Sequence, residues 1–158
     1  MVALSPVDNS NLLGTVTDDP ALAGNLGEII SSIIAPGSSV SLSTGTAKNI
    51  TSIILSAGDW DVWGGVCFNH AATTTVNDVQ VSIGSTSATI DPSAGRYAAL
   101  PMFGLVPASY LTVSSICIPG FTLQITSGGT PTIYLVATAD FAVSTMTAYG
   151  AIYARRRR

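Results

Sequence analysis

The side chains that we consider for catalysis or metal binding are His70 and the three carboxylates nearest the apolar strands, Asp59, Asp61 and Asp140. His70 is the only histidine and follows Asn69 at the end of a strand-like run. A Ser-His-Asp triad would have to use it, but the chain has no Gly-x-Ser-x-Gly motif. We therefore interpret His70 as a histidine at the rim of the fold. In an alternative, three copies meet on a threefold axis and their histidines bind zinc.

The carboxylates suggest a second chemistry, because two acids at a suitable separation hydrolyse glycosides. Asp59 and Asp61 share one face of a predicted strand directly after a turn, where acids commonly stabilise the turn and face water. Asp140 belongs to a different apolar strand. We predict that the chain is not an enzyme, with no catalytic, cofactor-binding or metal-binding residues.

The cysteines are Cys67 and Cys117. Cys67 sits in an apolar run and has no basic neighbour in the sequence to lower its pKa, so we do not expect a reactive thiol. Two buried thiols are the interpretation we prefer, and a disulfide between them is the alternative.

The end of the chain carries the one cluster of charge, formed by Arg155, Arg156, Arg157 and Arg158. One interpretation is a cationic patch that contacts a partner. The other is a solvated strand end, where charge discourages edge-to-edge pairing. Only two basic residues remain elsewhere against nine acidic ones. Because such an acidic body gives no support to nucleic-acid binding, we favour an acidic protein partner.

Strand geometry predicts that these arginines divide between two faces, because successive side chains of a strand point to opposite sides. If the last strand persists, Arg155 and Arg157 share a face with Tyr153, while Arg156 and Arg158 point the other way. We expect the tail to contact acidic groups, among them three in the N-terminal arm and at its base: Asp18, Asp19 and Glu28.

The rest of the chain is organised around residues 50–68, ITSIILSAGDWDVWGGVCF. Two strand-like runs, 47–56 and 59–69, flank a short Gly-containing connection, which predicts a hairpin. Apolar and polar residues alternate in the second run, as in a strand with one buried face. Trp60 is expected in the core, and Trp63, on the other face, needs a second apolar surface. Gly64 and Gly65 indicate that another backbone or a large side chain comes close.

Further strand-like runs follow at short spacing, and no segment keeps a helical period over three turns. The expected strands are 40–43, 76–84, 87–90, 98–106, 111–118, 121–126, 133–141 and 145–154, after an apolar run at 28–34. Pro101 and Pro107 mark the run 98–106 as an edge or irregular segment. About eight to ten strands predict an all-β fold, either a jelly-roll-type β-sandwich or a barrel. We predict the sandwich for residues 28–158.

Residues 1–27 lack periodicity and are rich in Asn, Asp, Gly and Pro. We interpret them as an extended N-terminal arm that anchors the domain, with a terminus of no fixed structure as the alternative. The sequence begins without a basic and apolar signal-peptide pattern. No apolar run approaches the roughly 18 residues of a membrane span.

Charged residues make up 9% of the 158 residues, against roughly 25% in an ordinary soluble domain. A domain so poor in charge hides much of its surface in an oligomer or in a larger assembly. The composition is also unlike that of a disordered chain, which combines low hydrophobicity with high charge.

Three segments together resemble a family of small tailed-bacteriophage virion proteins, the knob domains of fibres, spikes and head decorations. They are residues 57–66 (AGDWDVWGGV), 134–141 (YLVATADF) and 147–156 (TAYGAIYARR). The opening strand is also similar to that of the trimeric jelly rolls of the tumour-necrosis-factor and complement type. The resemblance covers roughly residues 45–158. It implies a homotrimeric structural protein on the virion surface, made in the bacterial host cytoplasm and attached through its arm to other virion proteins of the capsid, collar or tail. The resemblance implies no catalytic residues in this chain, because proteins of this family share none.

A glycan-binding module that recognises a host-surface receptor is the alternative function. Such a module predicts an exposed aromatic platform, for which the candidates are Trp63, Tyr97 and Tyr110.

Overall fold

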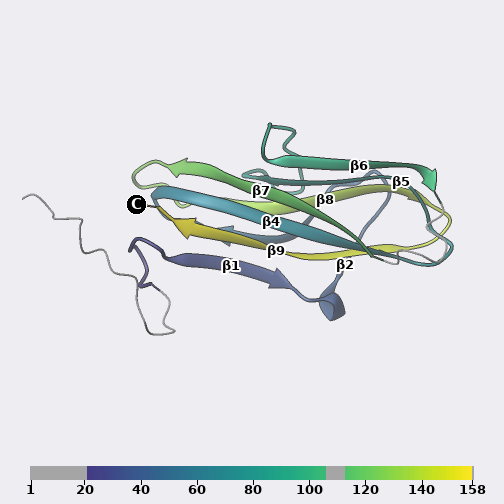
Figure 1. Cartoon of the computed structure of the whole chain (residues 1–158), viewed down its shortest axis with the longest axis horizontal. Coiled ribbons are helices and arrows are strands. Elements are labelled where there is room, and N and C mark those ends of the chain that lie inside the picture. The colour runs from purple at the N-terminus through teal and green to yellow at the C-terminus, as the bar shows by residue number, and fades with distance from the viewer. Residues whose placement is uncertain (1–20, 106–112, 158) are drawn as a thin grey trace, which may run out of the picture.

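The structure, a computed structural model, describes residues 21–105 and 113–157. Its strands form two antiparallel sheets that pack face to face (Figure 1), and the helical element in the described part is one 3₁₀ turn, η2 (Pro36–Ser38). The all-β sandwich prediction is therefore confirmed. The strands are β1 (Ile29–Ile34), β2 (Val40–Ser41), β3 (Lys48–Ile54), β4 (Gly58–His70), β5 (Thr75–Gly84), β6 (Tyr97–Leu105), β7 (Val113–Ile125), β8 (Thr132–Ala142) and β9 (Met146–Arg156).

The order of the strands is that of a jelly roll. The first sheet has the order β1-β9-β4-β7, with β2 also paired to β9, and the second has the order β3-β8-β5-β6. Strands that pair across the fold are nested in the sequence: β1 with β9, β3 with β8, β4 with β7, and β5 with β6. A long hairpin rolled into two sheets gives this nesting, which is the double Greek key of the jelly roll. Figure 1 shows the first and last strands side by side.

The predicted hairpin between residues 47–56 and 59–69 is wrong. Both runs are strands, but β3 pairs with β8 in the second sheet and β4 pairs with β7 and β9 in the first. The Gly-containing connection carries the chain from one sheet to the other instead of reversing it within a sheet. Gly58, whose φ is 138°, makes this change of direction in a conformation that L side chains rarely adopt. Among the described strands, only β5 and β6 are both consecutive and paired.

Two smaller expectations also differ from the structure. Residues 87–90 do not form a strand: residues 87 and 88 lie in a turn, where Ala88 has a φ of 48°, and residues 89 and 90 have no regular secondary structure. The runs 111–118 and 121–126 belong to one strand, β7. Pro119 and Gly120 lie at a shift of register in it, between Ile118 and Phe121, so they form a bulge and not a turn. By contrast, β6 is an edge strand, as Pro101 within it predicted, while Pro107 lies outside the described residues.

The core lies between the two sheets and is built by alternation along each strand. On β4, Trp60, Val62 and Val66 are fully buried, while Asp61, Trp63 and Gly65 face outward and are partly exposed. The strands β4 and β9 also approach very closely, because a Cβ at Gly150 would collide with the carbonyl oxygen of Gly65. The expectation of a close backbone approach at the glycine pair of β4 is thus confirmed.

The two tryptophans provide a matched test of this arrangement. Trp60 is 0% exposed and its indole Nε1 donates to the Ser56 carbonyl at 2.9 Å, whereas Trp63 is only partly buried. We expect Trp60→Ala to lower the free energy of unfolding by about 3–5 kcal/mol. Trp63→Ala should cost about 1 kcal/mol, mainly for its contact with Tyr153. Denaturant unfolding measures both, and equal losses would contradict the assignment of the inner and outer faces.

Candidate interaction surface

Arg156 is the buried one of the three arginines of the C-terminal cluster that the structure describes. It is 6% exposed, because β9 extends to this residue and turns its side chain to the inner side of the first sheet. Its guanidinium donates from Nε to Glu28 Oε2 at 2.8 Å, from Nη1 to the Ala57 carbonyl at 2.8 Å and from Nη2 to Ser56 Oγ at 2.6 Å. It also lies 4.2 Å from the ring centroid of Trp60. Arg156 is therefore a structural residue and not a free end of the tail.

Glu28 lies at the base of the N-terminal arm and completes this buried site. Besides the ion pair, its Oε2 accepts from the Gly24 amide at 2.8 Å, so the turn that precedes β1 is held by the same carboxylate. Burial raises the pKa of Glu28, but the hydrogen bonds from Arg156 and Gly24 and the Arg156 charge outweigh it and lower the pKa below its usual value. The predicted contact between the tail and Glu28 is present within the chain. Asp18 and Asp19 lie outside the described residues.

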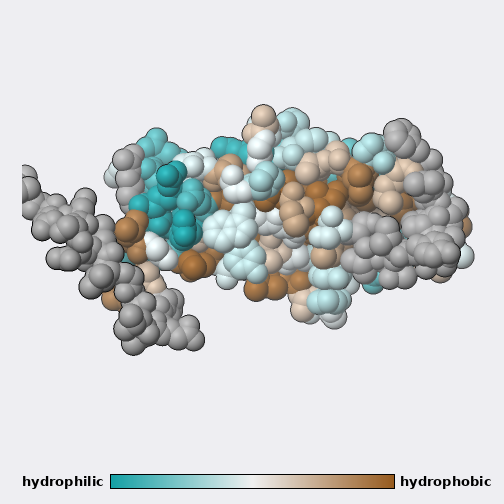
Figure 2. All heavy atoms as spheres, in the orientation of Figure 1, coloured by the Kyte–Doolittle hydropathy of each residue, from teal (hydrophilic) through white to brown (hydrophobic). Residues whose placement is uncertain are grey.

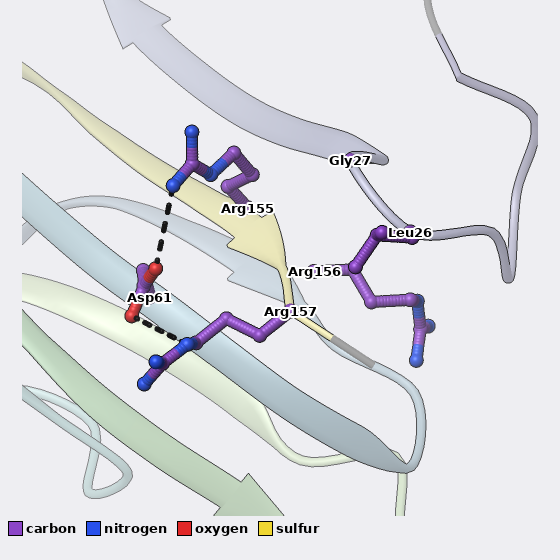
Figure 3. Close-up of a pocket in the computed structure, with 6 residues that line it drawn as sticks. All are labelled: Leu26, Gly27, Asp61, Arg155, Arg156 and Arg157. Atoms are coloured by element: carbon purple, nitrogen blue, oxygen red, sulfur yellow. Dashed lines mark ion pairs between the residues drawn. The ribbon is translucent and has the colours of Figure 1, made fainter. Parts of the chain in front are cut away.

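Arg155 and Arg157 lie on the outer face of the first sheet, as the alternation predicted. Figure 3 shows both reaching toward Asp61 on β4, with Arg156 pointing away from them. Arg155 Nη2 and Arg157 Nε each lie 3.7 Å from one oxygen of that carboxylate. The two arginine side chains are 58% and 54% exposed. Because both side chains are more than half exposed, their ion pairs with Asp61 contribute little to stability. For the same reason the two guanidinium groups remain accessible to a partner.

Asp61 is considered for catalysis in the sequence analysis, which does not predict its contact with Arg155 and Arg157. Its place opposite Arg155 follows from the β4–β9 register, in which Asp61 pairs directly with that residue. In the sequence, Asp61 is recognisable only as an acid on the outward face of a strand. Such a position indicates contact with water and does not indicate a partner.

An apolar groove crosses the same outer face, next to the arginine pair. Its floor is made by two small residues that pair directly across the strands, Gly65 and Ala151. One wall is Trp63 with Tyr153, stacked with their ring centroids 5.7 Å apart, and the other side carries Tyr149. The volume is about 550 Å³. We call this feature the outer groove, and its lining is completed by Ile33, Ile34, Ala35, Pro36, Gly64, Cys67, Ser115, Cys117, Ile118 and Gly150.

The surface around the outer groove changes character along the sheet. In Figure 2, hydrophilic residues gather at the end where β9 finishes, and hydrophobic residues lie further along the face and on the side of β1. Ile29 and Ile33, at the β1 edge, are 57% and 62% exposed. In the register of β1 with β9, Ile29 pairs with Arg155, and Ile33 pairs with Ala151 in the groove floor.

The expectation of two buried thiols is wrong. Both cysteines are free; Cys117 is exposed and Cys67 is partly exposed. The reason is the alternation of side chains along their strands: Cys67 on β4 and Cys117 on β7 both point outward and line the outer groove. Beside Cys67, the pKa of the Tyr149 hydroxyl is raised, first by desolvation and then by the neighbouring thiol.

The structure does not bring the proposed aromatic platform together. Trp63 lies in the outer groove on the first sheet. Tyr97 is on β6 of the second sheet, where it pairs with Ser82 and alternates with Ala98, which packs on the core. Tyr97 therefore faces outward on the opposite side of the sandwich. Tyr110 and Arg158 lie outside the described residues.

The residues considered for catalysis are also apart. His70 ends β4, as expected, but it is 7% exposed, with Nδ1 3.2 Å from the Ala71 carbonyl oxygen. So little exposed surface does not favour a zinc site shared between copies. Asp140 lies on β8 in the second sheet, where it accepts from Thr44 and Asn77. In the part of the chain that the structure describes, no three His, Cys, Asp or Glu side chains are grouped as metal ligands.

No helix among residues 21–105 and 113–157 is long and apolar enough to cross a membrane.

No protein-family model and no curated protein matches the chain. Among solved structures it is similar to "Structure of infectious bursal disease virus Gx strain", with 12% identity and a TM-score of 0.49. It is also similar to "Crystal structure of infectious bursal disease virus VP2 subviral particle", with 11% identity and a TM-score of 0.46. In both cases 92% of this chain is covered, and the chain spans 37% of the length of the other protein.

The different environments of neighbouring arginines predict different effects of their removal. We expect Arg156→Ala to lower the free energy of unfolding by about 3–5 kcal/mol, because it leaves the Glu28 carboxylate buried without its partner. Arg155→Ala, the matched control, should cost less than about 1 kcal/mol because its ion pair is exposed. Denaturant unfolding of the two variants distinguishes them. An Arg156 variant as stable as the control would contradict the role of the buried pair.

The lowered pKa of Glu28 predicts acid sensitivity. Because its pKa is lower in the folded than in the unfolded chain, ionised Glu28 stabilises the fold above the unfolded pKa. That stabilisation is lost as the pH falls through the folded pKa. The stability difference between the parent and Glu28→Gln should therefore be largest near neutral pH and shrink in acid. Unfolding curves from about pH 7 to about pH 3 test this, and a difference independent of pH would disprove it.

Proposed function

We propose that the chain is a structural protein of a bacteriophage virion, a trimeric knob on the particle surface. It is held to the particle through the N-terminal arm, as part of a fibre or a decoration of the capsid, and its loops add to host attachment. In this proposal the chain catalyses no reaction and carries no cofactor. Its partners are other copies of itself and other virion proteins.

The observation that supports the proposal best is the outer face of the first sheet. A jelly roll already buries one face of each sheet in its core. The first sheet adds a second, partly apolar face, with the outer groove and the exposed Ile29 and Ile33. Contiguous exposed apolar surface of this kind marks an interaction site in soluble proteins. Together with a chain only 9% charged, it fits a protein that works inside an assembly.

A glycan-binding module is less well supported than a protein partner. The candidates Trp63 and Tyr97 face opposite sides of the sandwich, so each would have to act without the other. The groove that contains Trp63 is lined mainly by apolar side chains and glycines. A sugar would need several polar partners to replace its bonds to water, whereas apolar side chains of a protein need none.

Two measurements test the proposal. Virus particles from host cells that carry this gene should contain the chain by mass spectrometry, and an antibody against it should label their surface in electron micrographs. Light scattering of the purified chain should give about three times the 16.1 kDa of one subunit. Absence from the particles would refute the virion role. A monomeric mass at micromolar concentration would refute the trimer.

A further inference from the structure

We propose that β1 is a releasable edge strand and that the contact between Glu28 and Arg156 controls its release. When Glu28 is protonated, β1 leaves β9 while the rest of the sandwich stays folded. Residues 21–28, through which the N-terminal arm joins the domain, come away with it. This device is a property of the fold itself and does not depend on the virion role.

The strand β1 is held weakly along its length. It pairs with β9 on one side, and on the other side it has no paired strand in the described chain. Its side chains alternate between exposed and partly buried, and none is fully buried. Ile30 and Ile34 pack against the core, and the hydroxyls of Ser32 and Thr51 form a hydrogen bond between β1 and β3. Elements with so few buried contacts open at a lower free energy than the whole domain.

The charged contact of this segment lies directly before β1, at Glu28. Its Oε2 accepts from Arg156 Nε and from the Gly24 amide, each at 2.8 Å. Its backbone carbonyl also accepts from the Arg156 amide at 2.9 Å. At its other end, β1 leads into η2, which has no buried residue, and the chain pairs with β9 again in β2. Loss of the Glu28 contact therefore leaves β1 attached through β2 at one end only.

One carboxylate controls this attachment. Arg156 is the charged side chain that faces Glu28. The other groups around the pair do not titrate: Ser56, Ala57 and Trp60. Residues 21–27 and β1 contain no charged side chain. The remaining charged side chains at this end of the first sheet have outward positions, on the side away from Glu28: Asp59, Asp61, Arg155 and Arg157.

The direction of the pH response follows from the surroundings of Glu28. Although burial acts to raise it, the pKa of Glu28 is lowered in the closed strand by the hydrogen bonds from Arg156 and Gly24 and by the Arg156 charge. Ionised Glu28 therefore favours the closed strand fully above the pKa of the open strand. That preference is lost as the pH falls through the pKa of the closed strand.

Release of β1 changes the outer face as well as the arm. Ile33 and Ile34 line the outer groove and leave it with the strand. The backbone of β9 from Gly150 to Arg155, which pairs with β1, then becomes an unpaired edge. Such an edge accepts a strand from another chain. Acid thus converts the first sheet from a closed form to one that accepts a strand.

Hydrogen exchange of the full chain, followed by mass spectrometry, tests the release. After correction for intrinsic exchange rates, protection of β1 should fall about tenfold or more between about pH 7 and about pH 4, while protection of β4 is unchanged. Glu28→Gln should show the low protection of β1 already at neutral pH. Asp61→Asn, the matched control at a more exposed carboxylate of the same end, should keep the response of the parent.

Protection of β4 also reports whether a variant is folded. Loss of protection in β1 and β4 together would overturn the inference, because the whole domain would then open in one step. Protection of β1 that does not change with pH in the parent would overturn it as well.

A cross-link between the two strands provides a second test. Ser31→Cys with Tyr153→Cys, in a chain whose Cys67 and Cys117 are changed to Ser, places two thiols at directly opposed positions of β1 and β9. The oxidised form should keep β1 protected in acid, and the reduced form should lose that protection. Equal loss of protection in both forms would show that acid acts elsewhere than on the pairing of β1 with β9, and would overturn the inference.

Discussion

The guanidinium of Arg156 holds together the end of the sandwich where the arm and the tail meet. It joins Glu28 before β1, Ser56 and Ala57 between β3 and β4, and the end of β9, in which it lies. The ion pair alone links residues 128 apart in the chain. The site is buried against the indole of Trp60, so loss of one partner would leave a charge in the core. The start of β1, and with it the departure of the arm, depends on this contact.

The paired strands β4 and β9, which begin and end beside Arg156, give the first sheet an inner face in the core and a different outer face. Their inward residues form the core, and their outward residues bring the outer groove and the arginine pair side by side. The groove exists because two small residues, Gly65 and Ala151, are paired where larger side chains would fill the space. The same alternation that buries Arg156 therefore exposes Arg155 and Arg157, so the three arginines of the run that the structure describes divide into one structural residue and two accessible ones.

The fold class and the division of the arginines between two faces could be predicted from the sequence, and two of the failures have related causes. The strands at Trp60 and Trp63 and their opposite faces followed from a period of two, which holds for any strand whatever its neighbour. The hairpin prediction failed because turn residues indicate a change of direction but not the sheet that the next strand joins. The buried-thiol prediction failed in a related way. The apolar run around Cys67 suggested that the thiol is buried, but the side chain of Cys67 points to the outer face of β4 and is partly exposed.

The sequence by itself determined that the chain is all-β, that Trp60 belongs to the core, and that Arg155 and Arg157 share a face that Arg156 does not. These are local properties, set by side-chain alternation and strand propensity. Only the tertiary structure decided that Asp61 lies between the two exposed arginines, that Arg156 is the arginine with which Glu28 pairs, and that Gly65 meets Ala151. Those contacts require the nested pairing of strands far apart in the chain. That pairing is set by how both sheets together bury their apolar faces, which no short stretch of residues encodes.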